Sequence, residues 1–251
     1  TLAYDGAGFV GWQRQARGTS IQGLLEEICA TLDGAPVTVE GAGRTDAGVH
    51  ALAQTATVSL ARDITAATFV RALNAHLPET VRVLSATLVG DEFHARFSAV
   101  AKAYRYRLWN DPILPPFERA YVWHVPWPRL DVDAMQRAAD LLRGTHDFSA
   151  FTGAGSRTRT HEREILSVTV ARHVDADGRG DGLITLDICG NGFLKHMVRN
   201  ITGTLVDVGR GTRRADEMSL LLQRGDRHEA GRTAPARGLF LVKVFYERPD
   251  L

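Results

Sequence analysis

Apolar and polar residues follow two periods along the first hundred residues, and these periods predict an ordered series of strands and helices. The predicted elements are a strand at 1–4, a helix, strands at 37–39 and 54–60, a helix at 65–76 and a strand at 81–89. The first helix begins near Thr19 and Gln22, which have capping-box spacing, and ends at Asp33-Gly34. Pro78 stops the second helix.

The second half of the chain repeats this order with one extra helix. The pattern predicts a strand at 103–109, a Pro-rich loop, a helix capped by Asp131 or Asp133, strands at 165–171 and 183–189, helices at 193–208 and 216–223, and a strand at 239–246. The order β-α-β-β-α-β is that of ferredoxin-like units. We therefore expect an α+β fold of two ferredoxin-like halves, with mainly antiparallel sheets and a central cleft. Sheets of this kind often bind RNA on an open face through aromatic residues, so we expect this cleft to bind RNA. A boundary near residues 97–101 would separate an N-terminal domain, 1–98, from a C-terminal domain, 99–251.

The stretch from Gly41 to His50 is the strongest candidate for chemistry. Its glycines permit unusual backbone angles and close approach of a ligand, and it carries one cation, Arg44, and one carboxylate, Asp46. A single carboxylate on an accessible loop suits a nucleophilic or single-base role, and suits metal binding or paired-carboxylate hydrolysis poorly. A plain tight turn, with a capping Asp46 and a surface Arg44, would explain the same residues.

Of two common phosphate-binding motifs, one fits this loop poorly and the other is absent. In Gly41-x-Gly43-x-x-Asp46 an acid occupies the position of the third glycine of the dinucleotide fingerprint, where it would repel a pyrophosphate. The phosphate-loop pattern ending in Gly-Lys-Ser/Thr is absent from the sequence.

Composition is that of a globular protein of one large or two ordinary domains, with 251 residues of which 44% are hydrophobic. Cys29 and Cys189 are far apart and have no metal-ligand spacing, and the nine histidines form no zinc pattern. The chain shows no secretory signal and no apolar run long enough to cross a membrane. These features predict a reducing compartment, and hence the cytoplasm.

Basic residues are clustered although the formal net charge is only +1. The clusters are Lys102, Arg105 and Arg107; Arg157, Arg159, His161 and Arg163; and Arg210, Arg213 and Arg214. Any one cluster is best explained as a solvated face. Three of them in a near-neutral chain favour a polyanionic partner.

Two further side chains could contact a substrate. Strand alternation places Lys102, Tyr104 and Tyr106 on one face; we expect Tyr106 in the core, while Tyr104 could stack on a base, worth roughly 1–3 kcal/mol. In the helix predicted at 193–208, Lys195 and Arg199 lie one turn apart opposite the apolar stripe. We expect Lys195 on a solvated face and Arg199 as the residue able to hold a carboxylate bidentately.

Motifs spanning nearly the whole chain resemble those of the TruA family of tRNA pseudouridine synthases. They are Tyr4-Asp5-Gly6, Gly11-Trp12-Gln13-Arg14-Gln15, Gly43-Arg44-Thr45-Asp46-Ala47-Gly48-Val49-His50, Phe93-His94-Ala95-Arg96-Phe97, Tyr104-Arg105-Tyr106, His196-Met197-Val198-Arg199-Asn200 and Gly238-Leu239-Phe240-Leu241-Val242. The third block is highly specific. Lys195 and Gly192 depart from the family pattern, but neither affects the expected nucleophile.

The resemblance implies an isomerase that converts uridine to pseudouridine at positions 38–40 of the tRNA anticodon stem-loop, with no metal or organic cofactor, as a homodimer that grips one tRNA. Carried over by position, Asp46 is the nucleophile, Tyr104 stacks on the target base, Arg44 helps to displace that base, and Arg199 pairs with the Asp46 carboxylate. The alternative is a non-catalytic RNA-binding protein on the same fold. A nucleotide-binding hydrolase is disfavoured by the missing phosphate-loop lysine and second carboxylate.

Overall fold

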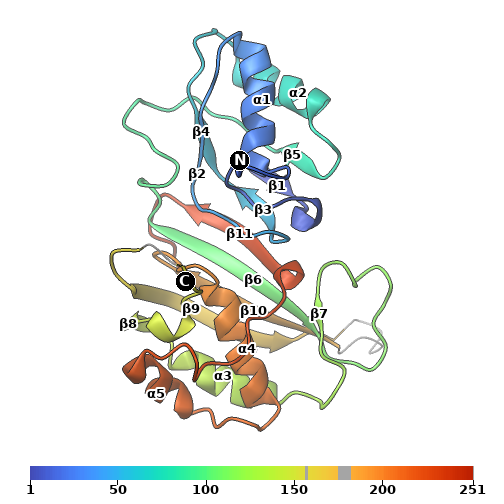
Figure 1. Cartoon of the computed structure of the whole chain (residues 1–251), viewed down its shortest axis with the longest axis vertical. Coiled ribbons are helices and arrows are strands. Elements are labelled where there is room, and N and C mark those ends of the chain that lie inside the picture. The colour runs from blue at the N-terminus through green and yellow to red at the C-terminus, as the bar shows by residue number, and fades with distance from the viewer. Residues whose placement is uncertain (156–157, 175–181, 251) are drawn as a thin grey trace. The chain divides into compact units, whose positions relative to one another are not determined.

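The computed structural model describes residues 1–155, 158–174 and 182–250, and these residues form two compact units. Unit 1 contains Thr1–Ala101 and Phe240–Pro249, and unit 2 contains Lys102–Leu239 and Asp250. The chain therefore returns to unit 1 at Phe240, after nearly all of unit 2. The elements of both units are labelled in Figure 1.

Unit 1 is built on a small mixed sheet. Its strands lie in the order β5 (Val81–Val83), β1 (Leu2–Tyr4), β3 (His50–Gln54) and β11 (Leu239–Phe245). β1 is antiparallel to both β3 and β5, whereas β11 runs parallel to β3 with Phe240 opposite His50. A separate antiparallel pair is formed by β2 (Val39–Gly41) and β4 (Ala56–Val58).

Two helices belong to unit 1, and both start at side-chain caps. α1 (Ile21–Asp33) is capped by Ser20, whose Oγ accepts from the Gly23 amide at 3.1 Å, and ends at Gly34 with φ +80°. α2 (Ala66–His76) is capped by Thr65. The expected helices are confirmed, but the α1 cap is Ser20 and not Thr19. A short 3-10 turn, η1 (Gly6–Gly8), follows β1.

Two strand predictions in unit 1 were wrong in extent. The strand expected at 54–60 is divided, because β3 ends at Gln54 and β4, which begins at Ala56, pairs in the other sheet. The strand expected at 81–89 ends at Val83, and beyond it Leu88 is 85% exposed. The apolar alternation there reflects exposed side chains, with no partner strand to extend the sheet among the described residues.

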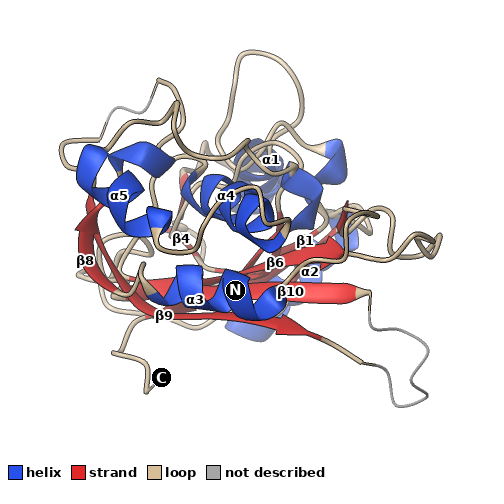
Figure 2. Ribbon diagram, turned by 90° about the horizontal axis from the view of Figure 1, so that it is seen from below, coloured by secondary structure: helices blue, strands red, loops and turns tan. Residues whose placement is uncertain are grey.

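Unit 2 contains a larger antiparallel sheet. Its strands lie in the order β6 (Ala101–Trp109), β10 (Leu183–Gly190), β9 (Glu162–Arg172) and β8 (Gly144–Asp147), and β7 (Trp123–His124) runs parallel to β6. The helices are α3 (Val132–Asp140), α4 (Met197–Gly209) and α5 (Glu217–Arg224). Two 3-10 turns, η2 (Ser149–Phe151) and η3 (Ala236–Gly238), complete the unit. α3 packs on β9 and against α4, as Figure 2 shows.

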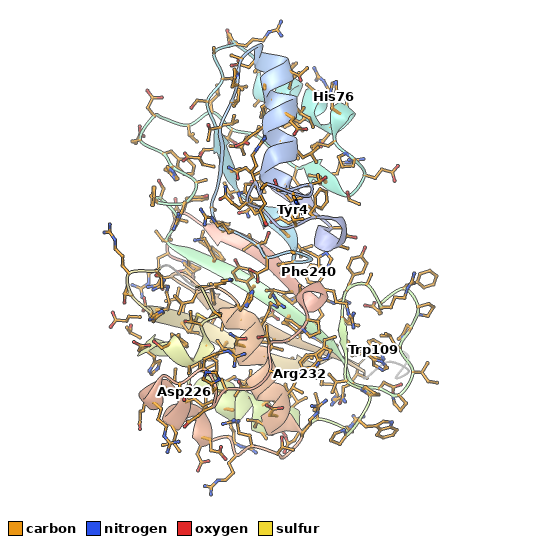
Figure 3. All side chains as sticks on the ribbon, in the orientation of Figure 1. Tyr4, His76, Trp109, Asp226, Arg232 and Phe240 are labelled. Atoms are coloured by element: carbon orange, nitrogen blue, oxygen red, sulfur yellow. The ribbon has the colours of Figure 1, made fainter. Side chains whose placement is uncertain are left out.

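The core of unit 2 lies between this sheet and its helices. Tyr106, Leu186 and Met197 are each at most 1% exposed, as are Phe148 and Phe151 beside η2. The expectation that Tyr106 is a core residue is confirmed, and its hydroxyl donates to the Pro235 carbonyl at 2.7 Å. Side chains of both units are drawn in Figure 3.

Three sequence predictions in unit 2 need correction. α4 begins at Met197 rather than at 193, because His196 has φ +62° and a left-handed residue cannot continue an α-helix. Lys195 therefore lies before the helix and not on its solvated face. Strands β7 and β8 were not expected, since each is short and lacks a clear alternation of apolar residues. Arg157 and most of the turn expected at 175–182 lie outside the described residues.

The protein is thus a mixed α+β protein whose sheet is mainly antiparallel, with five α-helices in the described parts of the chain. No helix among those residues is long and apolar enough to span a bilayer.

Candidate active site

The loop between β2 and β3 in unit 1 carries Arg44, Thr45 and Asp46. Thr45 is 7% exposed, whereas the side chains on either side of it are accessible: Arg44 is exposed and Asp46 is half-buried. The loop therefore holds its centre in the protein and presents one cation and one carboxylate towards the surface. Asp46 is therefore not fully buried in the core. An acid that acts on a large ligand must be at least partly exposed in this way.

Backbone hydrogen bonds fix this loop on both sides of Asp46. The Thr45 carbonyl accepts from the Trp12 amide at 3.0 Å, and the Asp46 carbonyl accepts from the Val49 amide at 3.1 Å. Earlier in the same loop, the Gly43 carbonyl accepts from Nε2 of Gln54 at 2.8 Å. The carboxylate consequently stands on a backbone with little freedom to shift.

A buried polar cluster supports the loop from below. The Tyr4 hydroxyl lies 2.8 Å from Thr45 Oγ1 and 3.4 Å from Gln54 Nε2. Burial raises the pKa of Tyr4 to about 12, although both hydrogen bonds act in the opposite direction. Tyr4 therefore stays a neutral phenol at physiological pH and links β1 to the loop and to the end of β3.

Glycines allow the loop to approach its supports closely. A Cβ on Gly11, whose φ is +106°, would lie 2.6 Å from the Thr45 carbonyl oxygen. A Cβ on Gly41 would lie 2.4 Å from the Trp12 ring. Both contacts are far shorter than van der Waals contact, so a side chain at either position would displace the loop that carries Asp46.

The end of the loop is anchored at the first residue of β3. His50 is 1% exposed, and its Nδ1 lies 3.1 Å from the Gly6 amide nitrogen and 3.0 Å from Asp5 Oδ1. Its ring stacks on Phe240 with centroids 4.6 Å apart, as expected from their opposed positions in β3 and β11. Tyr4 and Phe240 are labelled in Figure 3. This contact adds to the pairing of β11 with β3 in unit 1.

The other two candidate residues lie in unit 2. Tyr104, on β6, is 8% exposed and makes an edge-to-face contact with Phe193, with ring centroids 5.0 Å apart. Arg199, in the first turn of α4, is half-buried, and its Nε donates to the Ala234 carbonyl at 2.7 Å. Both side chains are therefore positioned by neighbours within unit 2.

The basic residues around Tyr104 are used within the unit. Arg105 makes a two-point contact with Asp187, its cross-strand neighbour, at 2.7 and 3.2 Å. Arg107 pairs with Glu118 at 2.8 Å. The alternation expected from the sequence thus separates these two arginines, which pair with acids, from the aromatic face of Tyr104 and Tyr106.

Several supporting residues were not identified from the sequence. Phe193, Gln54 and Ala234 had no role in the prediction, because each acts through a tertiary contact with a residue remote in sequence. Gly11 and Trp12 did stand in a quoted motif, and that motif was the only signal available for their packing on the loop.

The described residues contain no group of three or more His, Cys, Asp or Glu arranged to hold a metal ion. The loop itself offers one half-buried carboxylate, Asp46, on a hydrogen-bonded backbone, next to one exposed cation, Arg44. Such a loop defines the chain as a candidate for covalent or proton-transfer chemistry on a large substrate.

Comparison with known proteins identifies the class as an isomerase that converts uridine to pseudouridine. A family model described as tRNA pseudouridine synthase matches residues 2–98 and 138–247. The matched residues include Arg44, Asp46 and Arg199 but not Tyr104. This chain belongs to the tRNA pseudouridine synthase family.

Similar proteins cover almost the whole chain. A protein named tRNA pseudouridine synthase A from Solidesulfovibrio magneticus is 47% identical over 255 residues, covering 100% of this chain and 91% of its own length. Proteins of the same name from Syntrophotalea carbinolica and Pelobacter propionicus are 43% and 44% identical, covering 99% and 98% of this chain and 96% and 98% of their own.

Proposed function

We propose that this enzyme isomerises uridine to pseudouridine at positions 38–40 of the anticodon stem-loop of tRNA, with Asp46 as the nucleophile. The observation that carries the proposal is the half-buried Asp46 on a loop fixed by the Trp12, Val49 and Gln54 hydrogen bonds. The family and the names of the similar proteins support tRNA as the substrate.

The proposed reaction is an isomerisation in which a carboxylate in a fixed position acts on the nucleoside. The C–N glycosidic bond of uridine breaks, the uracil turns, and a C–C bond forms to the same sugar. The ring carbon that joins the sugar loses its proton and the freed ring nitrogen gains one, so no atom is added or lost overall. Asp46 forms a transient covalent bond to the nucleoside, and this bond breaks before the product is released. The anchored backbone keeps the carboxylate within reach of the nucleoside. A target base that has left the helix costs a few kcal/mol of unstacking. Arg44, which is exposed beside Asp46, occupies the position in the stack that the target base has left.

Tyr104 and Arg199 complete the proposed site. Tyr104 stacks on the extruded base, its ring held on edge by Phe193 at 5.0 Å. Arg199 pairs with the Asp46 carboxylate and keeps it oriented. Because its Nε already donates to the Ala234 carbonyl, a two-point pairing uses the terminal Nη1 and Nη2 groups.

The proposal extends to the assembly. Both halves follow a ferredoxin-like plan, a central cleft accepts the RNA, and the enzyme acts as a homodimer in the cytoplasm without metal or organic cofactor. Sedimentation that gives only the monomer mass at micromolar concentration would exclude the homodimer.

The test uses unmodified tRNA transcript incubated with the purified chain, followed by mapping of pseudouridine along the RNA. Wild type should modify positions 38–40, and Asp46→Asn should abolish the product while tRNA binding persists. Asp63→Asn, which neutralises an exposed carboxylate elsewhere in unit 1, is the matched control and should react like wild type. Turnover retained in Asp46→Asn would exclude Asp46 as the nucleophile, and product at other uridines would exclude the proposed positions.

A further inference from the structure

A cavity of about 660 Å³ lies in unit 2, where the start of α3, the end of α4 and the segment leading into α5 meet. Its charged lining consists of four arginines and two aspartates: Arg137, Arg210, Arg213, Arg214, Asp131 and Asp216. None of these residues belongs to the candidate active site. Three of the arginines form the basic cluster singled out in the sequence, which the proposed reaction does not use.

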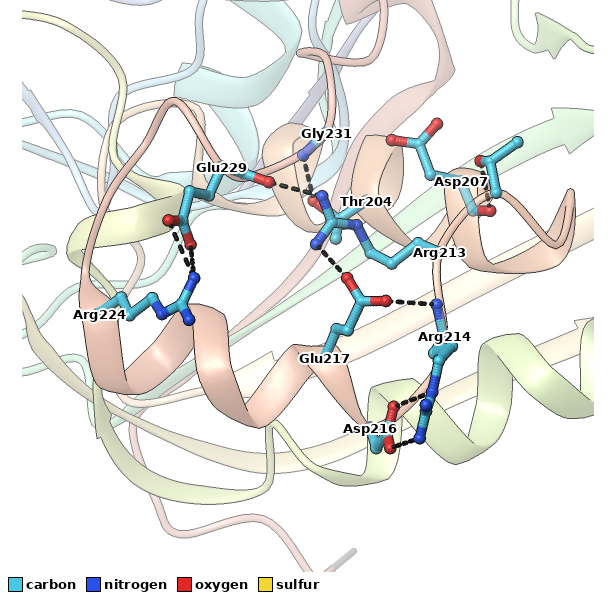
Figure 4. A network of polar contacts seen from close by, with 10 residues as sticks. Thr204, Asp207, Arg213, Arg214, Asp216, Glu217, Arg224, Glu229 and Gly231 are labelled. Carbon is cyan, nitrogen blue, oxygen red and sulfur yellow. Dashed lines mark hydrogen bonds and ion pairs between the residues drawn. The ribbon is translucent and has the colours of Figure 1, made fainter.

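Two of the lining arginines, Arg213 and Arg214, are held by polar contacts that are drawn in Figure 4. Arg213 donates to Glu217 Oε2 at 3.3 Å and to the Glu229 carbonyl at 2.6 Å. Arg214 grips the Asp216 carboxylate through Nε, at 3.1 Å, and through Nη2. These pairs fix the chain between α4 and α5 and neutralise most of the charge on the two guanidinium groups.

The other two arginines supply the unbalanced charge. Arg137 is exposed on α3 and Arg210 is half-buried beyond the end of α4, and neither side chain has an ion pair or hydrogen bond within the described parts of the chain. The Nε of Arg210 is buried and lacks an acceptor among those residues. A buried N–H without an acceptor costs roughly 1–3 kcal/mol, so a movement of Arg210 that gives its guanidinium group an oxygen acceptor would be favourable.

The acids of the cavity do not cancel this charge. The Asp131 side chain caps α3 by accepting from the Ala134 amide at 2.8 Å, where the positive end of the helix dipole offsets its charge. Asp216 is held by Arg214. The cavity is therefore a basic, polar hollow with two guanidinium groups available to a ligand.

We propose that this cavity binds backbone phosphates of the RNA substrate, away from the loop that carries Asp46, with Arg137 and Arg210 as the contacting residues. Guanidinium groups match the geometry of phosphate oxygens, and the volume far exceeds a single phosphate ion but accepts a stretch of phosphodiester chain. The inference rests on the proposed function for the identity of the RNA.

The test measures tRNA binding at a series of salt concentrations for wild type, Arg137→Gln, Arg210→Met and the double variant. Each lost phosphate contact lowers the slope of log K against log salt by about 1. We expect a fall of about 1 for each single variant and about 2 for the double variant, with weaker binding at physiological salt. The control is Arg224→Gln, which removes an equal charge from an arginine of α5 that pairs with Glu229 and does not line the cavity.

Thermal unfolding of each variant shows whether a loss of binding reflects a loss of fold. A double variant that is folded and keeps the wild-type slope would overturn the inference, as would an equal fall in slope for Arg224→Gln. Titration with inorganic phosphate distinguishes the two sources of a phosphate group. Saturable phosphate binding that depends on both arginines, with an unchanged tRNA slope, would assign the cavity to a small phosphate ligand and refute the RNA contact. Because binding is measured without turnover, failure of the proposed reaction remains separately visible.

Discussion

Gly11 offers the sharpest test of how the fold positions Asp46. In Gly11→Ala, the new Cβ would lie 2.6 Å from the Thr45 carbonyl oxygen and 3.1 Å from the carbonyl carbon of Asp46. Ordinary contact begins near 3.4 Å, so the loop backbone must move by about 0.8 Å. The substitution therefore shifts Asp46, the proposed nucleophile, without altering its side chain.

The magnitude follows from two separate costs. An alanine held at φ +106° is strained by about 1–3 kcal/mol, and displacing the Thr45 carbonyl weakens its hydrogen bond from Trp12, worth about 1 kcal/mol. We expect a loss of roughly 2–4 kcal/mol in the free energy of unfolding. A shift of a reacting group by about 1 Å costs on the order of 100-fold in rate, so with Asp46 as the proposed reacting group the single-turnover rate should fall by about two orders of magnitude.

Two other glycines separate these effects. Gly34→Ala introduces a positive-φ alanine at the end of α1, where no atom lies within 4 Å, and so carries strain alone. Gly8→Ala has neither a positive φ nor a neighbour within 4 Å. Gly34→Ala should lose about 1 kcal/mol of stability with an unchanged rate, and Gly8→Ala should resemble wild type.

The assay combines urea unfolding with single-turnover formation of pseudouridine in a tRNA transcript, under conditions where each variant is fully folded. If Gly11→Ala reacts at the wild-type rate, or if Gly34→Ala loses as much activity, then close packing on Thr45 does not position Asp46 and the reasoning fails.

Three further predictions follow from buried groups. Burial raises the pKa of Tyr4 from 10.0 to about 12, so the folded state resists deprotonation of this side chain. The free energy of unfolding should therefore hold up to pH 10 and then fall by roughly 3 kcal/mol towards pH 12. Alkaline urea titrations should show that Tyr4→Phe lacks this component of the fall. Burial and nearby acids raise the pKa of Cys29 to about 11, and burial raises the pKa of Cys189. Neither thiol should therefore react with iodoacetamide at pH 8 until urea unfolds the protein. Rapid labelling of the native protein, counted by mass spectrometry, would contradict this. Asp131→Ala should cost about 1 kcal/mol in urea unfolding, because it removes the cap that accepts from the Ala134 amide; no change in midpoint would show that the cap contributes nothing.

The sequence determined the elements whose signals are local. α1 and α2 were predicted because apolar residues recur at helical spacing between clear start and stop residues, and the caps lie within one residue of expectation. The loop bearing Arg44 and Asp46 was found for the same reason, since its glycines and its charges stand together in ten residues. The family was identifiable because its motifs are short, contiguous and in order.

Only the tertiary structure decided the features that depend on remote partners. No local signal shows that the chain leaves one sheet for another at Thr55, that β11 joins β3 beside His50, or that His196 delays the start of α4. The contacts of Gly11 with Thr45, of Tyr104 with Phe193 and of Arg199 with Ala234 likewise join residues far apart in sequence. Periodicity reports which residues are buried, but the neighbours that share that burial are chosen by packing of the whole unit, and those neighbours hold the carboxylate in place.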